Sequence, residues 1–143
     1  MRFRYISAAL ALTFMAGMTA SAQNSPSAEG ARVYVINLEN GQHVQSPVLI
    51  QFGLSGMGVA PFGNDGPNTD NTGHHHLIID ADPPTAGAIP ADAQHIHYGR
   101  GQTEASVELT PGEHTLYLVF GDMSHQLHNP PVISEPVTII VDP

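Results

Sequence analysis

The fold is best predicted from one stretch near the middle of the chain, Gly73-His74-His75-His76-Leu77-Ile78-Ile79-Asp80. Three consecutive histidines lead directly into an apolar, β-branched segment, a composition that favours a strand. Side chains alternate across a strand, with a rise of about 3.3 Å per residue. We therefore expect His74 and His76 on one face, roughly 6.6 Å apart along the strand, and His75 on the other.

Further strands are predicted on both sides of this stretch by β-branched or alternating segments between Gly and Pro turns. These segments are 32–38, 47–54, 104–109, 114–120 and 136–141. In 47–54 the alternation places Val48, Ile50, Phe52 and Leu54 on one face, which we expect in the core. About seven short strands without a helical period predict an all-β fold, a single immunoglobulin-like or cupredoxin-like β-sandwich.

Three segments lack a strand pattern and are expected to be loops: 55–73, 82–93 and 122–131. The first is rich in Gly, Pro, Asn and Asp and ends at the histidine stretch. Loops this long within a small domain are usually functional or disordered. We expect the first and third loops to meet over the histidine strand at one end of the sandwich, because binding groups usually gather on loops carried by a rigid scaffold.

The first 22 residues have the pattern of a secretory signal peptide. Arg2 and Arg4 give a basic start, 6–18 is an apolar run, and Ala20-Ser21-Ala22 is a small-residue cleavage site. The run is short for a membrane span, so stable membrane insertion is not expected. The predicted organisation is a signal peptide at 1–22, a flexible leader at 23–31 and a His-rich β-sandwich domain at 32–143, exported to the periplasm or beyond the cell.

The charge balance after Ala22 is strongly acidic: thirteen Asp and Glu residues face only Arg32 and Arg100, a net charge of −11 with the histidines neutral. This argues against nucleic-acid partners and anionic membranes, and it would raise the local concentration of cations. The chain has no cysteine. A bound metal ion would therefore be held by nitrogen, oxygen or thioether groups.

Seven of the nine histidines fall in three short clusters, and two such clusters repeat the His-x-His spacing. Two His-x-His pairs on neighbouring segments would supply four imidazole nitrogens at the distance of about 2.0–2.1 Å that copper or zinc requires. We expect the clusters to converge on a metal ion, with copper as the first candidate and zinc as the alternative. The candidate ligands are His74, His76, His95 and His97 first, then His125, His128 and Met57, and last Met123.

Three functions are compatible with this pattern. The first is a protein that handles or delivers copper, with the ion and another exported metal-handling protein as partners. The second is a cell-envelope interaction module with a structural histidine network, and the third is a copper/zinc dismutase-like enzyme. No Gly-x-Ser-x-Gly or His-Glu-x-x-His pattern is present, and catalysis is not the favoured reading. We expect His114 to cap or pack, His43 to be solvated, and His75 to join the core or support the metal ligands.

Several motifs occur in a recognisable order along the chain. They are 53–61 (GLSGMGVAP), 73–77 (GHHHL), 94–99 (QHIHYG), 101–104 (GQTE), 111–116 (PGEHTL), 121–125 (GDMSH) and 130–132 (PPV). Together they resemble the exported bacterial family called domain of unknown function 4399, with Tyr98 and Thr110 where Phe and Pro are expected. The resemblance implies an exported single-domain β protein and supplies no reaction. The His and Met content is also similar, in ligand type only, to periplasmic copper chaperones.

Overall fold

The computed structural model describes residues 25–63 and 70–143. The predicted signal peptide and the first two residues of the predicted leader lie outside the described residues. Ten strands and no helix occur in the part that is described, which confirms the all-β prediction. The strands are β1 (Arg32–Val35), β2 (Gln42–Val44), β3 (Val48–Ser55), β4 (Gly58–Val59), β5 (Thr72–Ile79), β6 (His95–Tyr98), β7 (Glu104–Val107), β8 (Gly112–Gly121), β9 (Leu127–Ile133) and β10 (Val137–Val141).

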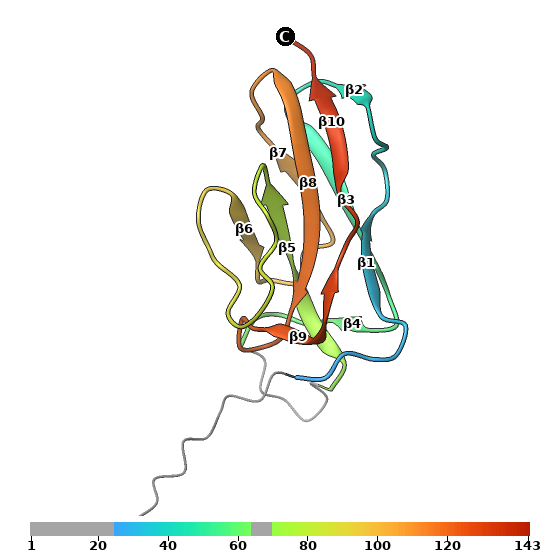
Figure 1. Cartoon of the computed structure of the whole chain (residues 1–143), viewed down its shortest axis with the longest axis vertical. Helices are drawn as coiled ribbons and strands as arrows, with labels where there is room; N and C mark the ends of the chain where they lie inside the picture. The colour runs from blue at the N-terminus through green and yellow to red at the C-terminus, as the bar shows by residue number, and fades with distance from the viewer. Residues whose placement is uncertain (1–24, 64–69) are drawn as a thin grey trace, which may run out of the picture.

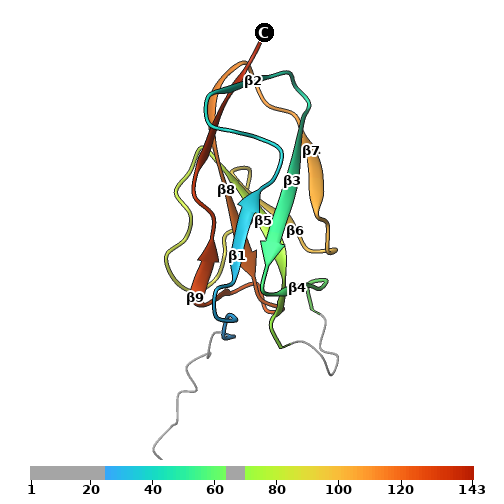
Figure 2. The ribbon, with the colours of Figure 1, turned by 90° about the vertical axis from the view of Figure 1, so that its right-hand side faces the viewer.

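The strands form two sheets that pack face to face (Figures 1 and 2). The smaller sheet has the order β1-β3-β7, and the larger has the order β2-β10-β8-β5-β4, with β6 beside β5 and β9 beside β8. The core between them joins Val48, Ile50 and Phe52 of β3 to Leu77 of β5 and Leu118 of β8. The predicted inward face of β3 and the predicted sandwich are therefore both confirmed.

Strand β5 is central in the larger sheet and is covered on both faces. It pairs with β8 along one side and with β6 and β4 along the other. Leu77 and Ile79 face the main core, whereas Ile78 belongs to a second apolar cluster on the outer face, with Ile89, Val119 and Leu127. Because both faces are buried, the apolar run of β5 is continuous rather than alternating.

The loop predicted at 122–131 is wrong in its second half, because Leu127–Ile133 forms β9. Two consecutive prolines in this segment removed the sequence signal for a strand. Proline is tolerated here because Pro130 and Pro131 fall in an irregularity of the β8–β9 register, between the pairs Phe120–Val132 and Gly121–Leu127, where no N–H has to be donated to β8. Likewise, the loop predicted at 55–73 contains the short strand β4, which pairs in parallel with the start of β5. No helix among the described residues has the length and apolar character to span a bilayer.

Candidate metal centre

Four histidines from three separate segments converge on the outer face of the larger sheet. His74 and His76 come from β5, His97 from β6, and His125 from the turn between β8 and β9. One ligand nitrogen from each ring lies within 4.8 Å of the other three. Two nitrogens on opposite sides of a shared ion stand about 4.1 Å apart. The four rings would therefore have to draw closer together to bind one ion.

Strand register explains why three of these rings meet. His76 is the direct cross-strand partner of His97, so both side chains project from the same face, and His74 lies one pleat further along that face. His74 is opposite Gly121, the last residue of β8. The start of β8 pairs with the end of β10, so the cluster lies at the end of the sandwich away from the C-terminus (Figure 1).

Two glycines leave room for the rings. A Cβ atom added to Gly121 would lie 2.9 Å from His76 Nε2 and 2.6 Å from the side chain of Ile89. A Cβ atom added to Gly99 would lie 2.5 Å from His97 Nε2. Real Cβ atoms do not approach so closely, so any larger residue at either position would displace an imidazole ring from the cluster.

The fourth ring, that of His125, is held by a turn built around Asp122. This carboxylate is 4% exposed. Its Oδ1 accepts hydrogen bonds from the backbone N–H groups of Ser124 and Gln126, and its Oδ2 accepts one from the hydroxyl of Ser25. His125 itself donates its N–H to the Asp122 carbonyl and has a φ of 64°, in the left-handed region. Asp is suited to such a turn because its side chain can bond the backbone two residues on.

The ring nitrogens of the cluster have no hydrogen-bond partners among the described residues. Both nitrogens of His74 and of His76 are buried and unpaired, as are Nε2 of His97 and Nε2 of His125. Buried polar atoms are nearly always paired, and leaving one unpaired costs roughly 1–3 kcal/mol. Six such atoms in one place are the strongest sign that the rings serve something other than the fold.

Burial keeps these rings neutral. Burial, with a smaller contribution from the neighbouring imidazoles, lowers the pKa of His74 to about 4 and that of His76 to about 2. Burial also lowers the pKa of His97 and of His125. Asp122 acts in the opposite direction on His74 and His125, because its negative charge favours a cation nearby. A neutral imidazole is the form that binds a metal ion.

The ring of Phe62 covers the cluster from the solvent side. It lies edge-on to His74, His97 and His125, with centroid distances of 5.8, 5.3 and 5.8 Å, and is 51% exposed. Its backbone N–H donates to the Gly99 carbonyl, and the next N–H, of Gly63, donates to the carbonyl of Met123. Part of the long Gly-rich segment therefore meets the Asp122 turn over the histidines.

Four predicted ligands are not among the four converging histidines. His95 shares a face with His97, but its Nδ1 lies 2.8 Å from Asp92 Oδ1. Met57 packs against the main core, and Met123 is half-buried in the turn that carries His125.

The fourth of them, His128, lies on the inner face of β5. A Cβ atom added to Gly73 would be 3.0 Å from its Nε2. Its ring stacks on the core residue Phe120 at 5.8 Å. His128 is therefore separated by the sheet from the four converging rings.

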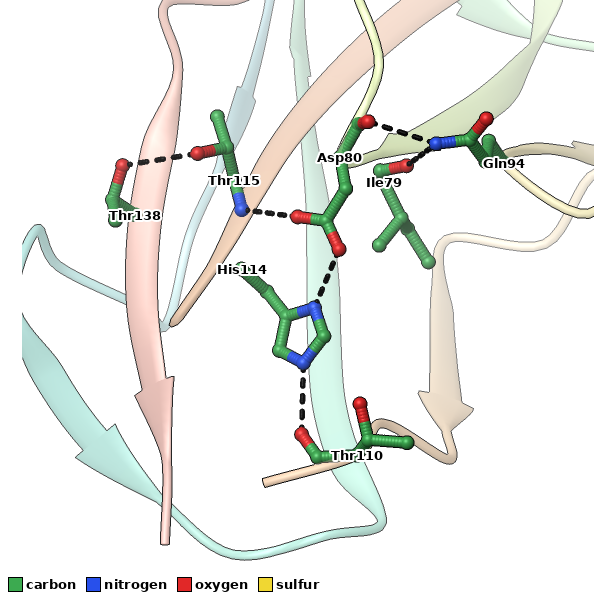
Figure 3. Close-up of polar contacts among 7 residues, drawn as sticks. All are labelled: Ile79, Asp80, Gln94, Thr110, His114, Thr115 and Thr138. Atoms are coloured by element: carbon green, nitrogen blue, oxygen red, sulfur yellow. Dashed lines mark hydrogen bonds and ion pairs between the residues drawn. The ribbon is translucent and has the colours of Figure 1, made fainter. Parts of the chain in front are cut away.

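The other histidines have local roles. His75 lies on the core face beside Phe52 and Phe120, with its Nδ1 3.2 Å from the Gln102 carbonyl. His43 is exposed, 2.7 Å from an Asp142 carboxylate oxygen. The third, His114, bonds at both ring nitrogens, to Asp80 Oδ2 at 2.7 Å and to the Thr110 carbonyl at 2.8 Å (Figure 3).

Sequence reasoning missed four residues that shape the centre: Phe62, Gly99, Gly121 and Asp122. Only Asp122 carried a usable signal, since Asp followed two residues later by Ser is typical of a side-chain-capped turn. The two glycines owe their role to ring positions that only the folded register defines. Phe62 lies in a segment without a strand or helix pattern, where sequence gives no side-chain direction.

The family described as "Domain of unknown function (DUF4399)" matches residues 50–142. The chain belongs to this family. The matched region contains all four converging histidines and every glycine and aspartate that positions them, and the resemblance drawn from the motifs is thereby confirmed. No curated protein and no solved structure matches the chain.

Proposed function

We propose that this chain binds one copper ion through His74, His76, His97 and His125, and that it handles or delivers the ion outside the cytoplasm. The observation that carries the proposal is the convergence of four neutral imidazoles whose buried nitrogens have no partner among the described residues. A shared metal ion would satisfy one nitrogen of each ring and offset the cost of burying it.

The donor set favours copper. Imidazole nitrogens suit zinc, copper, iron and nickel, whereas magnesium, calcium and manganese prefer carboxylate and carbonyl oxygens. No carboxylate joins the four rings in the described cluster. Among divalent first-row ions a given nitrogen site binds copper most tightly. The proposal of an exported protein rests separately on the signal-peptide pattern at 1–22.

The geometry speaks against a purely structural histidine network. In such a network each ring would bond a carbonyl or carboxylate, as His114 does. The four rings instead face one another, with neighbouring centroids 4.4–5.0 Å apart. In the part of the chain that the structure describes, the half-exposed ring of Phe62 stands over them. An ion so placed is near solvent, which suits uptake and release.

Metal uptake by the stripped protein tests the proposal. Copper(I), copper(II) and zinc are added separately, and bound metal per chain and melting temperature are measured. We expect about one copper ion per chain and a melting temperature that rises with copper concentration, because a ligand that binds only the folded state stabilises it. A chain that takes up no copper, or takes it up without thermal stabilisation, contradicts the proposal.

Two matched variants locate the site. His97→Gln removes a converging ring, and His95→Gln removes the other histidine of the same His-x-His pair. We expect His97→Gln to weaken copper binding at least about tenfold, since even outer-shell changes cost 10- to 100-fold, and His95→Gln to leave it nearly unchanged. Equal losses in the two variants would overturn the ligand assignment.

A further inference from the structure

A hollow opens on the surface directly beside the four-histidine centre. It is lined by Phe62, His97, Gly99, Arg100 and Gln102 and has a volume of about 430 Å³. Sites for small molecules commonly span about 300–1,000 Å³. The hollow shares His97 and Phe62 with the metal centre, so a molecule bound in it would lie next to the metal ion.

The hollow presents hydrogen-bond donors. Gln102 Oε1 accepts the backbone N–H of Arg100 at 2.8 Å, which orients the side-chain amide. Its NH₂ group and the guanidinium of Arg100 form no hydrogen bond or ion pair with another described residue. Gly99 and Gly101 flank Arg100, and Gly101 has a φ of 83°, so a tight turn carries the guanidinium. Such a set of donors is suited to an anion.

The charges around the metal centre favour an anion in the hollow. Arg100 is one of only two basic residues after Ala22, yet it lines the mouth of a site proposed for a cation. The four imidazoles are neutral and bring no negative charge to that ion. The nearby carboxylate of Asp122 has both oxygens engaged by Ser25, Ser124 and Gln126. The single negative charge of Asp122 would offset at most half of the charge of a divalent ion held there, and the remaining charge is costly away from water.

We propose that this hollow binds a small carboxylate, held by Arg100 and Gln102, that lies beside the copper ion and offsets its charge. The proposal rests on the proposed function. The guanidinium fork matches the two oxygens of a carboxylate or phosphate. The ring of Phe62 forms an apolar wall of the same hollow, which favours an acid with a short carbon chain over inorganic phosphate.

The test uses the full chain loaded with copper(II) in a buffer that does not bind metals. Acetate, propionate and inorganic phosphate are titrated separately, and the electron paramagnetic resonance spectrum of copper reports binding. We expect propionate to change the spectrum saturably and to bind more tightly than phosphate. Arg100→Gln should weaken propionate binding at least about tenfold, the loss expected for one charge-assisted contact.

The matched control is Arg32→Gln, which makes the same charge change at a residue on β1 that lies 5.5 Å from the Tyr34 ring and does not line this hollow. This variant should bind propionate as the parent does. Without added carboxylate, Arg100→Gln should bind copper at least as tightly as the parent, because a repelling cation has been removed.

The outcomes separate the two proposals. A chain that takes up no copper overturns both. A chain that takes up copper but shows no saturable spectral change with propionate, or the same affinity in Arg100→Gln, overturns the carboxylate site alone. Phosphate binding as tight as propionate binding overturns the assignment of a carboxylate.

Discussion

Two groups of buried histidines on the same sheet differ in their hydrogen-bond partners and in the direction of their pKa shifts. His114, near the start of β8, bonds Asp80 through one nitrogen and the Thr110 carbonyl through the other (Figure 3). At the other end of β8, the rings of His74 and His76 have no partner among the described residues. Burial opposes protonation at His114, but the Thr110 carbonyl and the Asp80 carboxylate together raise its pKa. Burial lowers the pKa at His74 and His76.

The difference separates a structural histidine from a binding one. His114 is given acceptors by its neighbours, and its charge contributes to holding the fold together. The cluster is instead denied acceptors, which makes its rings poor contributors to stability and good candidates for ligands. Each prediction below tests this contrast.

Acid should produce the largest effect, on the stability of the metal-free protein. The folded-state pKa values of His74 and His75 are about 4 and that of His76 about 2, all below the unfolded value near 6.5. Below pH 6.5 the unfolded chain therefore binds protons that the folded chain does not. The free energy of unfolding should fall with pH by up to about 1.4 kcal/mol per pH unit for each histidine.

Denaturant melts between pH 7.5 and pH 4.5, with and without copper, measure this slope. Copper should shift the loss of stability to lower pH, because protons and metal compete for the same nitrogens. A metal-free protein as stable at pH 4.5 as at pH 7.5 would show that the rings have acceptors after all.

Gly121→Ala should be next in size and should damage the cluster directly. The new Cβ atom would press on His76 Nε2 and on Ile89, and overpacking of this kind costs about 1–3 kcal/mol. We expect a lower melting temperature and weaker copper binding. Gly58→Ala is the control, since its Cβ atom would meet only a Thr72 methyl at 3.5 Å and its backbone has no positive φ. Copper binding unchanged in Gly121→Ala would place the ion elsewhere.

Asp80→Asn should weaken the structural histidine and spare the metal centre. Asn tolerates the φ of 54° at this position, but it removes the negative charge that faces His114. The folded pKa of His114 is raised. The contact between protonated His114 and Asp80 therefore contributes its whole stabilisation below the unfolded pKa, and this stabilisation is lost as pH rises through the folded pKa. The variant should lose roughly 1–2 kcal/mol at pH 6 and less at pH 9.

Melts of this variant at the two pH values, together with copper titration at pH 7.5, check the contrast. Copper affinity should match that of the parent. A large loss of copper affinity in Asp80→Asn would mean that the two histidine groups are coupled through β8.

Alternation predicted much of this molecule but not its long-range pairings. It correctly put His74 and His76 on one face and Val48, Ile50 and Phe52 in the core, because a strand period of two needs no tertiary information. Whether His95 or His97 faces His76 depends on the register of β6 against β5, and the two strands are separated by the fifteen residues 80–94.

The turn at Asp122 shows a second limit. His125 reaches the cluster through a left-handed backbone conformation, and an alternating pattern says nothing about such a residue. The strand β9 was hidden by Pro130 and Pro131, which fall in an irregularity of the β8–β9 register. Sequence patterns therefore gave the residue types of the site and two of its members on one face, while pairing register and turn geometry decided the rest.

Ser25→Ala should give the smallest effect and tests how tightly the Asp122 turn must be held. The hydroxyl of Ser25 donates to Asp122 Oδ2 at 2.8 Å, while Oδ1 keeps its two backbone donors. Losing one such contact should cost about 0.5–1.5 kcal/mol and weaken copper binding only a few-fold.

Ser27→Ala is the control for this change, because its hydroxyl donates to the Pro130 carbonyl at an exposed position on the same short segment. Melting temperature and copper affinity are measured for both variants. If Ser25→Ala loses stability but not affinity, the turn holds His125 without help from the Ser25 contact. If both variants lose the same affinity, the segment 25–27 acts through its backbone pairing with β9 rather than through the Asp122 carboxylate. A loss of copper affinity confined to Ser25→Ala would show that the two carboxylates differ as the two histidine groups do. Asp80 bonds a histidine ring directly, whereas Asp122 bonds the turn that positions a histidine ring.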